Sequence, residues 1–304
     1  MSTGLDPDTF ESRLAGPGLG FRVGPFDLFL KARVKGLAAP LARLYRHYPV
    51  LDADRVFSIN LTIHDVWRPA WRDRRRVRVL VDGQQPHEDM PAGQALAVLE
   101  WAQNLVIAMR FHSFLMLHAA VLERNGHALL MPAAPGHGKT TLCAALALRG
   151  WRLFSDEFGL LRPGGADMIP LPRPMPLKNA SIEVIRQFAP GVELGPEIPG
   201  TIKGTVAHLP PPADSVAAAQ RTAPAALVVF PRWRADAPLT LEPCHPAQAF
   251  MELARNAFNY ELVGEAAFQS LRMIIDRSRC FDLVYSDLDE AIAVLTRLAD
   301  DTDG

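Results

Sequence analysis

The sequence is poor in cysteine, nearly neutral and free of long uninterrupted apolar runs. Its three cysteines, Cys143, Cys244 and Cys280, lie far apart and match neither a metal-binding spacing nor a disulfide framework. Such usage is typical of proteins in the reducing cytoplasm. The formal net charge is −1, which provides no overall electrostatic attraction to nucleic acids or anionic membranes.

Signals for export or membrane insertion are also missing. Residues 1–6 lack the basic and apolar regions of a signal peptide. The most apolar window, residues 105–122, contains Arg110, His112 and His118 and passes from a predicted helix into a predicted strand, so it does not predict a membrane span. We therefore expect a cytoplasmic protein with no membrane and no nucleic-acid partner.

The chain does contain enough apolar sequence for a sizeable core. Of its 304 residues, 49% are hydrophobic, and this length allows one large domain or two modest ones. We expect a small N-terminal α+β region over residues 1–111, which carries no readable functional motif. Residues 112–299 are expected to form the main α/β domain, and the acidic residues 300–304 a disordered tail.

Hydrophobic periodicity and turn residues predict the order of the elements. In the N-terminal region we expect strands within 21–34, 55–66 and 76–81, and helices at 36–47 and 92–111. In the main domain we expect strands at 127–131, 151–155, 158–162 and 225–230, and helices at 140–149, 182–188, 246–256, 265–277 and 291–298.

The most informative stretch, residues 133–141, resembles a phosphate-binding loop. It matches the pattern G-x-x-x-x-G-K-[ST] except that Ala133 takes the first glycine position. An apolar strand precedes it and an apolar helix follows, so a chance glycine turn is the weaker interpretation. Such a loop directs backbone N–H groups and the positive end of a helix at phosphate oxygens. The predicted nucleotide-binding residues are Pro135, Gly136, His137, Gly138, Lys139, Thr140 and Thr141.

Two adjacent carboxylates, Asp156 and Glu157, follow the loop closely. The interval leaves room for one helix and one short strand, so the pair is expected at the carboxyl end of that strand, where ligands of open α/β sheets gather. One carboxylate can hold Mg²⁺, and the other can accept a proton from an attacking hydroxyl. The alternative is an N-cap Asp followed by a solvated Glu.

The sequence Asn125-Gly126 between apolar runs is a strong hairpin signal. The strand that carries His118 should therefore pair antiparallel with the strand that enters the phosphate loop. Depending on register, His118 then points toward the phosphates or into the core. It can hydrogen-bond a phosphate or the catalytic acid, or be an ordinary core histidine.

Taken in order, these motifs resemble a known family. Residues 117–121, the hairpin, the phosphate loop, Arg149-Gly150 and Asp156-Glu157 are similar to the catalytic domain of HPr kinase/phosphorylase. They are more similar to the divergent HPr kinase-related proteins, which include kinases that tailor ribosomally made peptides. The resemblance implies an HPr kinase/phosphoenolpyruvate carboxykinase-like P-loop domain and, often, a homo-oligomer. It also implies a peptide or small-protein acceptor and, in some systems, a peptide-binding chaperone.

The departures from the family pattern have functional meaning. Ala119 replaces the glycine after the upstream histidine, and Glu157 replaces the second aspartate. The later signature E-I-R-G-x-G is degraded, with Lys203-Gly204 in the R-G position and no carboxylate in the Glu position. This loss argues against the reverse, phosphorolytic reaction, whereas kinase activity needs less.

Two further lysines are predicted to act on the transferred phosphoryl group. The stiff proline-rich stretch 170–178 ends at Lys178, and residues 191–203, rich in Gly and Pro, are expected to be a mobile lid that ends at Lys203. Both cations can neutralise charge on a phosphoryl group, although Lys178 could also be an ordinary surface lysine. Residues 255–260 carry many polar groups and are candidates to line the acceptor cleft.

One basic stretch suggests a different partner. Arginines gather around Trp67 and Trp71, which could serve to dock an acidic peptide or a nucleic acid. Interspersed carboxylates, Asp65, Asp73 and Asp82, favour a solvated hairpin turn instead.

The predicted reaction is transfer of the γ-phosphoryl group of ATP, with Mg²⁺, to a Ser or Thr hydroxyl. Asp156 is predicted to accept the proton of the hydroxyl. The metal is expected to be bound by Thr140 and Glu157. Supporting catalytic roles are assigned to Lys139, Lys178, Lys203 and His118. No base-reading motif is visible, so GTP and pyrophosphate also fit as donors. The alternatives are a small-molecule kinase, which needs an enclosed acceptor pocket, and a non-catalytic nucleotide sensor, which would tolerate Asp156→Asn.

Overall fold

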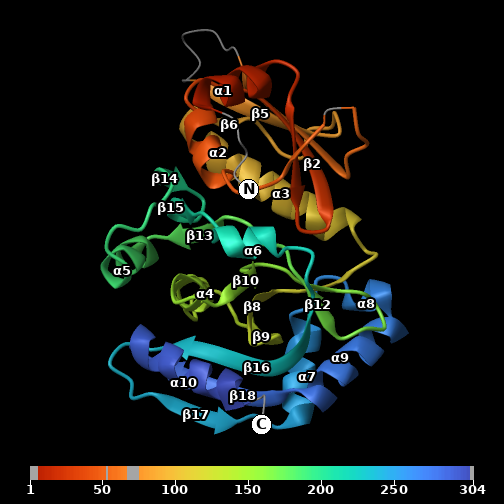
Figure 1. The fold of residues 1–304 in the computed structure, drawn as a ribbon, viewed down its shortest axis with the longest axis vertical. Coiled ribbons are helices and arrows are strands. Elements are labelled where there is room, and N and C mark those ends of the chain that lie inside the picture. Colours follow the sequence, from red (N-terminus) through yellow and green to blue (C-terminus); the bar gives the residue numbers. More distant parts are fainter. Residues whose placement is uncertain (1–5, 53, 67–74, 302–304) are drawn as a thin grey trace.

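The computed structural model describes residues 6–52, 54–66 and 75–301, which form a mixed α/β protein with several mixed sheets (Figure 1). The segment around Trp67 and Trp71 lies outside the described residues. The elements of the N-terminal region are α1 (Pro7–Ala15), β1 (Leu19–Val23), β2 (Phe26–Arg33), α2 (Ala38–Leu44), β3 (Val50–Leu51), β4 (Ile59–Val66), β5 (Arg76–Val81), β6 (Met90–Pro91), the 3₁₀-helix η1 (Ala92–Gln94) and α3 (Ala95–Arg110).

The remainder of the described chain begins with β7 and ends with α10. Its elements are β7 (Leu115–Leu117), β8 (Ala119–Arg124), β9 (His127–Pro132), α4 (Lys139–Leu148), β10 (Arg152–Ser155), β11 (Gly159–Leu161), β12 (Asp167–Ile169), β13 (Met175–Lys178), α5 (Ala180–Phe188), β14 (Ile198–Thr201), β15 (Gly204–Leu209), α6 (Ala213–Ala217), β16 (Ala223–Trp233), β17 (Thr240–Pro243), α7 (Pro246–Arg255), α8 (Tyr260–Val263), α9 (Glu265–Arg277), β18 (Arg279–Tyr285) and α10 (Leu288–Asp300).

The N-terminal strands form one sheet in the order β3-β1-β2-β4-β5-β6. β2 and β4 are parallel, and the other neighbouring pairs are antiparallel. Buried and partly exposed residues alternate along β2 and β5, which is the period of two that predicted these strands. The predicted helices correspond to α2 and to η1 with α3.

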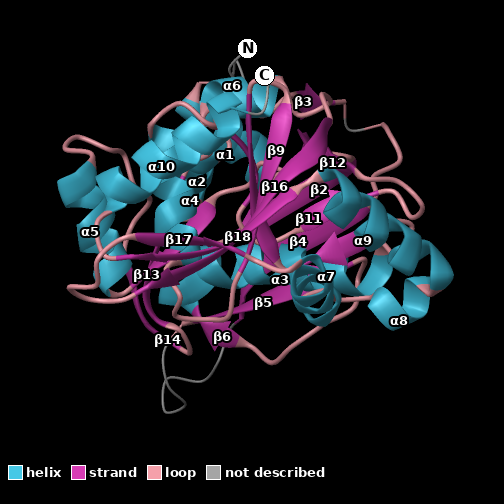
Figure 2. Ribbon diagram, turned by 90° about the horizontal axis from the view of Figure 1, so that it is seen from below, coloured by secondary structure: helices cyan, strands magenta, loops and turns pink. Residues whose placement is uncertain are grey.

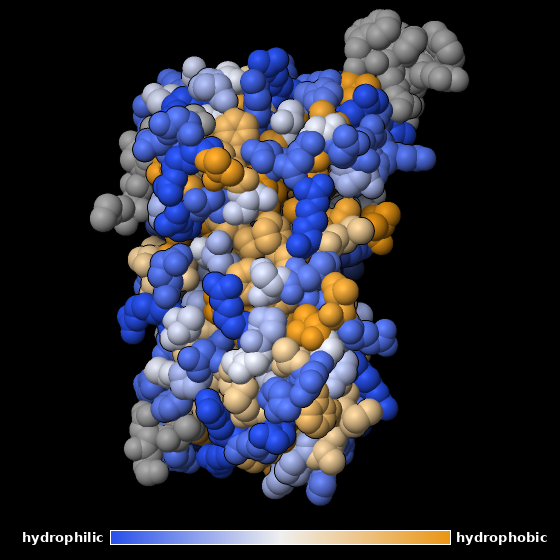
Figure 3. Space-filling view, turned by 90° about the vertical axis from the view of Figure 1, so that its right-hand side faces the viewer, coloured by the Kyte–Doolittle hydropathy of each residue, from blue (hydrophilic) through white to orange (hydrophobic). Residues whose placement is uncertain are grey.

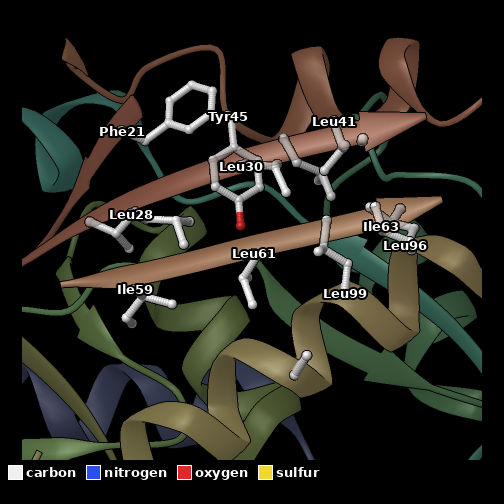
Figure 4. Close-up of a cluster of buried hydrophobic side chains, with 14 of the residues drawn as sticks. Phe21, Leu28, Leu30, Leu41, Tyr45, Ile59, Leu61, Ile63, Leu96 and Leu99 are labelled. Atoms are coloured by element: carbon white, nitrogen blue, oxygen red, sulfur yellow. The ribbon is translucent and has the colours of Figure 1, made fainter. Parts of the chain in front are cut away.

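Apolar side chains of β1, β2 and β4 meet those of α2 and α3 in one cluster (Figure 4). The cluster does not stop at the predicted domain boundary, because buried Met116, Phe158 and Leu160 of the main domain belong to it. The N-terminal region therefore packs on the rest of the chain through a shared core.

The main sheet contains β10-β8-β9-β16-β12-β11-β7 in that order, with β18 also paired to β16 and β17 to β18. β16 is parallel to both β9 and β18. The predicted hairpin is confirmed: β8 pairs antiparallel with β9, and Asn125 and Gly126 at its turn have φ values of 54° and 81°. Positive φ at both positions is the reason for the Asn-Gly sequence.

Helices cover both faces of this sheet, as Figure 2 shows with α4 and α10 on one side and α7 and α9 on the other. The strands are accordingly apolar on both faces. Leu122 and Leu129 belong to the cluster that contains residues of α4 and α10. Their neighbours Val121 and Leu130 belong to the cluster that contains residues of α7 and α9.

A third, small sheet has the order β13-β15-β14. It includes the end of the segment 191–203 predicted as a mobile lid, because Ile198–Thr201 form β14, whereas residues 191–197 form no helix or strand. The turn after β14 is closed by Thr201, whose hydroxyl accepts from the Lys203 N–H at 3.0 Å and donates to the Gly204 carbonyl at 2.7 Å. Hydrogen bonds of this kind favour a defined hairpin over an open loop.

Polar contacts join the N-terminal region to the proline-rich segment that leads to β13. Arg173 is buried and pairs with Glu100 of α3 at 2.7 Å, and it also donates to the Glu100 carbonyl at 3.1 Å. Tyr45 donates to the same carboxylate at 2.7 Å, and Tyr48 donates to the carbonyl of Pro172 at 2.8 Å. The proline-rich segment is thus held by side chains of the N-terminal region.

Several elements near the end of the chain differ from the sequence prediction, among them β18 and α10. β18 was not predicted, because Arg279 and Asp282 interrupt its apolar pattern. α10 extends to Asp300, which was assigned to a disordered tail. Arg124 donates to the Asp300 carboxylate at 2.8 Å, and this contact fixes the last turn of the helix.

The surface shown in Figure 3 is largely hydrophilic, with apolar residues interspersed near its middle. Within the described ranges, none of the helices combines the length and the apolar character that a membrane span requires.

The buried pair of Arg173 and Glu100 leads to a stability prediction. Glu100→Gln leaves the Arg173 charge without a counter-charge in a buried position, so we expect a loss of roughly 3–5 kcal/mol in the free energy of unfolding. Asp276→Asn is the control, since it removes an exposed partner of Arg272 and should cost at most about 1 kcal/mol. Urea denaturation of the two variants measures the difference, and equal losses would contradict the interpretation.

Candidate active site

The candidate phosphate loop connects the end of β9 to the start of α4. Gly136 and Gly138 have φ values of 87° and 83°, a region that favours glycine. Ala134, Pro135 and Gly136 are exposed, so the backbone of the loop is accessible to a ligand. His137 is half-buried.

The carbonyls of the loop are held by the ends of two neighbouring strands. The N–H of Trp233, the last residue of β16, donates to the His137 carbonyl at 3.0 Å. The hydroxyl of Tyr285, the last residue of β18, donates to the Gly138 carbonyl at 3.2 Å. Because both carbonyls accept hydrogen bonds from these strands, the strands hold the loop in place.

Lys139 and Thr140 both contact Asp156. Lys139 is buried, and its ammonium donates to the Asp156 carbonyl at 2.9 Å. The Thr140 hydroxyl donates to Asp156 Oδ2 at 3.0 Å. Thr141 is half-buried in the first turn of α4. The first turn of α4 and the end of β10 therefore meet as the sequence predicted.

The other carboxylate oxygen of Asp156, Oδ1, is buried and has no hydrogen-bond partner among the described residues. Burial raises the pKa of this carboxyl, as does the adjacent Glu157, although Lys139 acts in the opposite direction. An unpaired buried oxygen is costly unless a ligand or water satisfies it. A carboxylate oxygen is a ligand that Mg²⁺ accepts, and a hydroxyl beside it suits the same ion.

Among the described residues, there is no cluster of three or more His, Cys, Asp and Glu side chains that could hold a metal. Asp156 and Thr140 nevertheless fit Mg²⁺, because this ion is commonly bound through one or two protein ligands together with substrate phosphates and water.

Glu157 contacts His118, and the charge of Lys139 acts on this carboxylate as well. His118 Nε2 lies 3.6 Å from Glu157 Oε2, and both side chains are partly exposed. Burial alone would raise the pKa of Glu157, but the interaction with His118 and the charges of Lys139 and Lys178 outweigh it and bring the pKa to about 2. Glu157 is therefore ionised at neutral pH.

His118 is held by its backbone, between β7 and β8. Its N–H donates to the Asn256 carbonyl at 2.6 Å, and the N–H of Phe258 donates to the Met116 carbonyl at 2.9 Å. The Asn259 side chain accepts from the Met116 N–H at 3.0 Å and donates to the Phe114 carbonyl at 2.8 Å. The segment 256–259 is thereby fixed beside His118.

Phe258 is the most exposed part of this arrangement. Its ring lies 5.5 Å from the His118 ring and 5.2 Å from the Phe158 ring, yet the residue is 48% exposed. An exposed aromatic ring therefore lies beside His118, the partner of Glu157. The sequence had proposed residues 255–260 for the acceptor cleft, and the structure brings this segment beside His118, the partner of Glu157.

The two predicted lysines come from the third sheet. Lys178 ends β13, and Lys203 lies in the turn between β14 and β15. The positive charge of Lys178 helps to lower the pKa of Glu157, so it acts on the acidic pair at short range. Partial burial lowers the pKa of Lys203, the nearby Lys178 lowers it further, and Glu157 raises it.

The acidic pair also lines a cavity of about 20 Å³, which can hold about one water molecule. Its walls include residues that sequence reasoning did not place in the site, namely Glu100, Trp101 and Asn104 of α3, Arg173 and His208. Both ring nitrogens of His208 are buried and lack a partner within the described ranges. These residues carry no motif, and only the packing of α3 on the third sheet brings them here.

Every predicted site residue thus lies in one region around the loop and the acidic pair. Comparison with models of protein families and with curated proteins gives no match.

Gly138 provides a stability test of the loop geometry. A Cβ at this position would lie 2.5 Å from the Tyr285 hydroxyl and 2.8 Å from Trp233 Cβ, whereas at Gly136 it would meet open space. Both glycines have positive φ, so alanine costs about 1–2 kcal/mol at either position. We expect Gly138→Ala to lower the melting temperature clearly more than Gly136→Ala, as measured by calorimetry. Equal shifts would show that β16 and β18 do not constrain the loop.

Asp156 provides a test of the electrostatics. Since burial raises its pKa above the ordinary value of 3.8, the folded protein keeps this proton to a higher pH than the unfolded chain does. The free energy of unfolding should therefore fall as the pH rises from about 4 through the raised pKa. Asp156→Asn lacks this penalty and should be more stable than wild type near pH 8, without added metal or nucleotide.

The difference between the two proteins should shrink toward about pH 4, where both side chains are neutral when folded. Glu157, whose pKa is about 2, stays ionised in the folded protein throughout this range. Denaturant titrations across this range measure the difference, and a gap independent of pH would rule out a raised pKa as its cause.

Proposed function

We propose that this chain is an ATP- and Mg²⁺-dependent kinase that phosphorylates a Ser or Thr hydroxyl of a peptide or small protein, with the P-loop architecture of the HPr kinase-related family. The observation that carries the proposal is that two adjacent carboxylates have separate partners. Asp156 contacts the loop residues Lys139 and Thr140, and Glu157 contacts His118.

These contacts favour exchanging the roles that the sequence analysis assigned. Asp156, with its unpaired oxygen and its bond from Thr140, is suited to the metal. Glu157 is more exposed than Asp156, and its partner His118 contacts the exposed ring of Phe258, so Glu157 is suited to the acceptor hydroxyl. When bound, Mg²⁺ would neutralise charge on the donor phosphates.

In the proposed reaction, the acceptor oxygen forms a bond to the γ-phosphorus, and the bond from that phosphorus to the β–γ bridging oxygen breaks. The electron pair leaves with ADP, and the acceptor proton passes to Glu157. A loose transition state does not require a strongly basic carboxylate. A pKa of about 2 is therefore compatible with Glu157 as the proton acceptor. Lys139, Lys178 and Lys203 would offset charge on the transferred group.

The cavity beside the acidic pair favours a macromolecular acceptor. Small-molecule sites commonly have roughly 300–1,000 Å³, but this cavity has about 20 Å³. Glu157 is partly exposed, and beside its partner His118 lies the exposed ring of Phe258, where we place an extended peptide. The retained Lys139, Thr140 and both carboxylates argue against a purely nucleotide-sensing module.

The proposal can be tested by mass spectrometry of an extract of the source organism, incubated with ATP, Mg²⁺ and the protein. We expect a phosphate adduct on a peptide Ser or Thr that forms with wild type. An adduct on a metabolite would replace the proposal with a small-molecule kinase. Absence of any adduct, with nucleotide binding intact, would favour the sensor.

Two matched variants then separate the roles of the carboxylates. Glu157→Gln should lower turnover of the identified acceptor by about 10²-fold or more and leave the Mg²⁺ requirement unchanged. Asp156→Asn should raise the Mg²⁺ concentration needed for half-maximal activity. If Asp156→Asn instead lowers turnover at every Mg²⁺ concentration and Glu157→Gln retains activity, the original assignment of the proton to Asp156 is correct.

A further inference from the structure

We propose that the N-terminal region positions Lys203 for phosphoryl transfer, and that Trp101 of α3 is the residue through which it does so. The catalytic consequence rests on the proposed kinase function, but the positioning itself does not. The N-terminal region carries no readable functional motif, so this assigns it a role.

The main contact is between a cation and an aromatic ring. The ammonium of Lys203 lies 5.6 Å from the centroid of the Trp101 ring. Tryptophan is the aromatic residue that attracts a cation most strongly through its ring face. Trp101 belongs to α3 and packs against the shared core, so the ring itself is firmly held.

A second contact fixes the other end of the same turn. Gln94 of η1 is buried, and its side-chain amide donates to the carbonyl of Gly200 in β14 at 2.8 Å. The turn that carries Lys203 is thus attached to the N-terminal region at two points. Gln94 holds the strand just before the turn, and Trp101 contacts the lysine itself.

The turn is also attached to the strand that carries Lys178. The Asn179 side chain accepts from the Thr205 N–H at 3.0 Å and donates to the Lys203 carbonyl at 3.4 Å. Asn179 has a positive φ of 50°, and a Cβ on Gly204 would lie 2.2 Å from its side-chain oxygen. Lys178 and Lys203 are therefore held as a pair of cations.

The Lys203 ammonium needs an attractive contact that offsets its repulsion from Lys178. Lys178 and Lys203 repel each other, and a flexible lysine stem would otherwise let the Lys203 ammonium move into solvent. Among the described residues, the Trp101 ring makes a cation–π contact with that ammonium, and the negative charge of Glu157 attracts it as well. Trp101 also lines the small cavity together with Asp156 and Glu157, so the ring lies on the side of the acidic pair.

A double-mutant cycle tests whether Trp101 acts through Lys203. Trp101→Leu and Lys203→Met should each lower kcat about tenfold, and the double variant should be no slower than Lys203→Met alone. Trp101→Tyr retains a ring and should restore most of the rate. Met109→Ala, an exposed apolar truncation on the same helix, should leave the rate unchanged. Multiplicative losses in the double variant would overturn the proposal.

Hydrogen exchange provides a measurement that does not depend on kinase activity. In the full-length protein, Trp101→Leu should accelerate amide exchange across residues 198–206 and leave α4 unaffected, whereas Met109→Ala should change neither. Unchanged exchange across 198–206 would refute the positioning role even if the kinase is active. Faster exchange in a protein that transfers no phosphate would retain the positioning and reject the proposed reaction.

Discussion

The hydrogen bond from Thr140 to Asp156 joins the start of α4 to the end of β10, and the geometry of the candidate site depends on it. Lys139 reinforces the connection through the Asp156 carbonyl. Because Glu157 is the next residue, the position of Asp156 also determines where the Glu157 side chain lies, and there it contacts His118. Burial makes this arrangement costly, because one oxygen of Asp156 has no partner in the described part of the chain. Such a cost is typical of a site arranged for a ligand.

The N-terminal region shares its hydrophobic core with the rest of the chain and contributes α3 to the wall beside the acidic pair. Its side chains hold the proline-rich segment before Lys178 and the turn that carries Lys203. Both predicted phosphoryl-binding lysines are therefore held partly by residues from the first third of the sequence.

The elements that the sequence predicted well are those with a local signal. The hairpin follows from Asn125-Gly126, and the loop follows from its glycines and Lys139. β18 was missed because Arg279 and Asp282 break its pattern, and only pairing with β16 makes it a strand. The contribution of Trp101 could not be foreseen, since an aromatic residue on an apolar helix gives no sign of its distant partner. The roles of the two carboxylates also required tertiary contacts, because adjacent acids look alike in sequence.

The support of the phosphate loop has a consequence for how the protein is made. The Tyr285 hydroxyl that holds the Gly138 carbonyl is separated from it by 147 positions in the chain. During synthesis, every residue of the loop motif leaves the ribosome long before β18 does. A nascent chain that lacks β18 thus carries the complete motif without the Tyr285 contact, which forms only after this strand inserts beside β16. The loop sequence is therefore complete long before the contact that supports the Gly138 carbonyl can form.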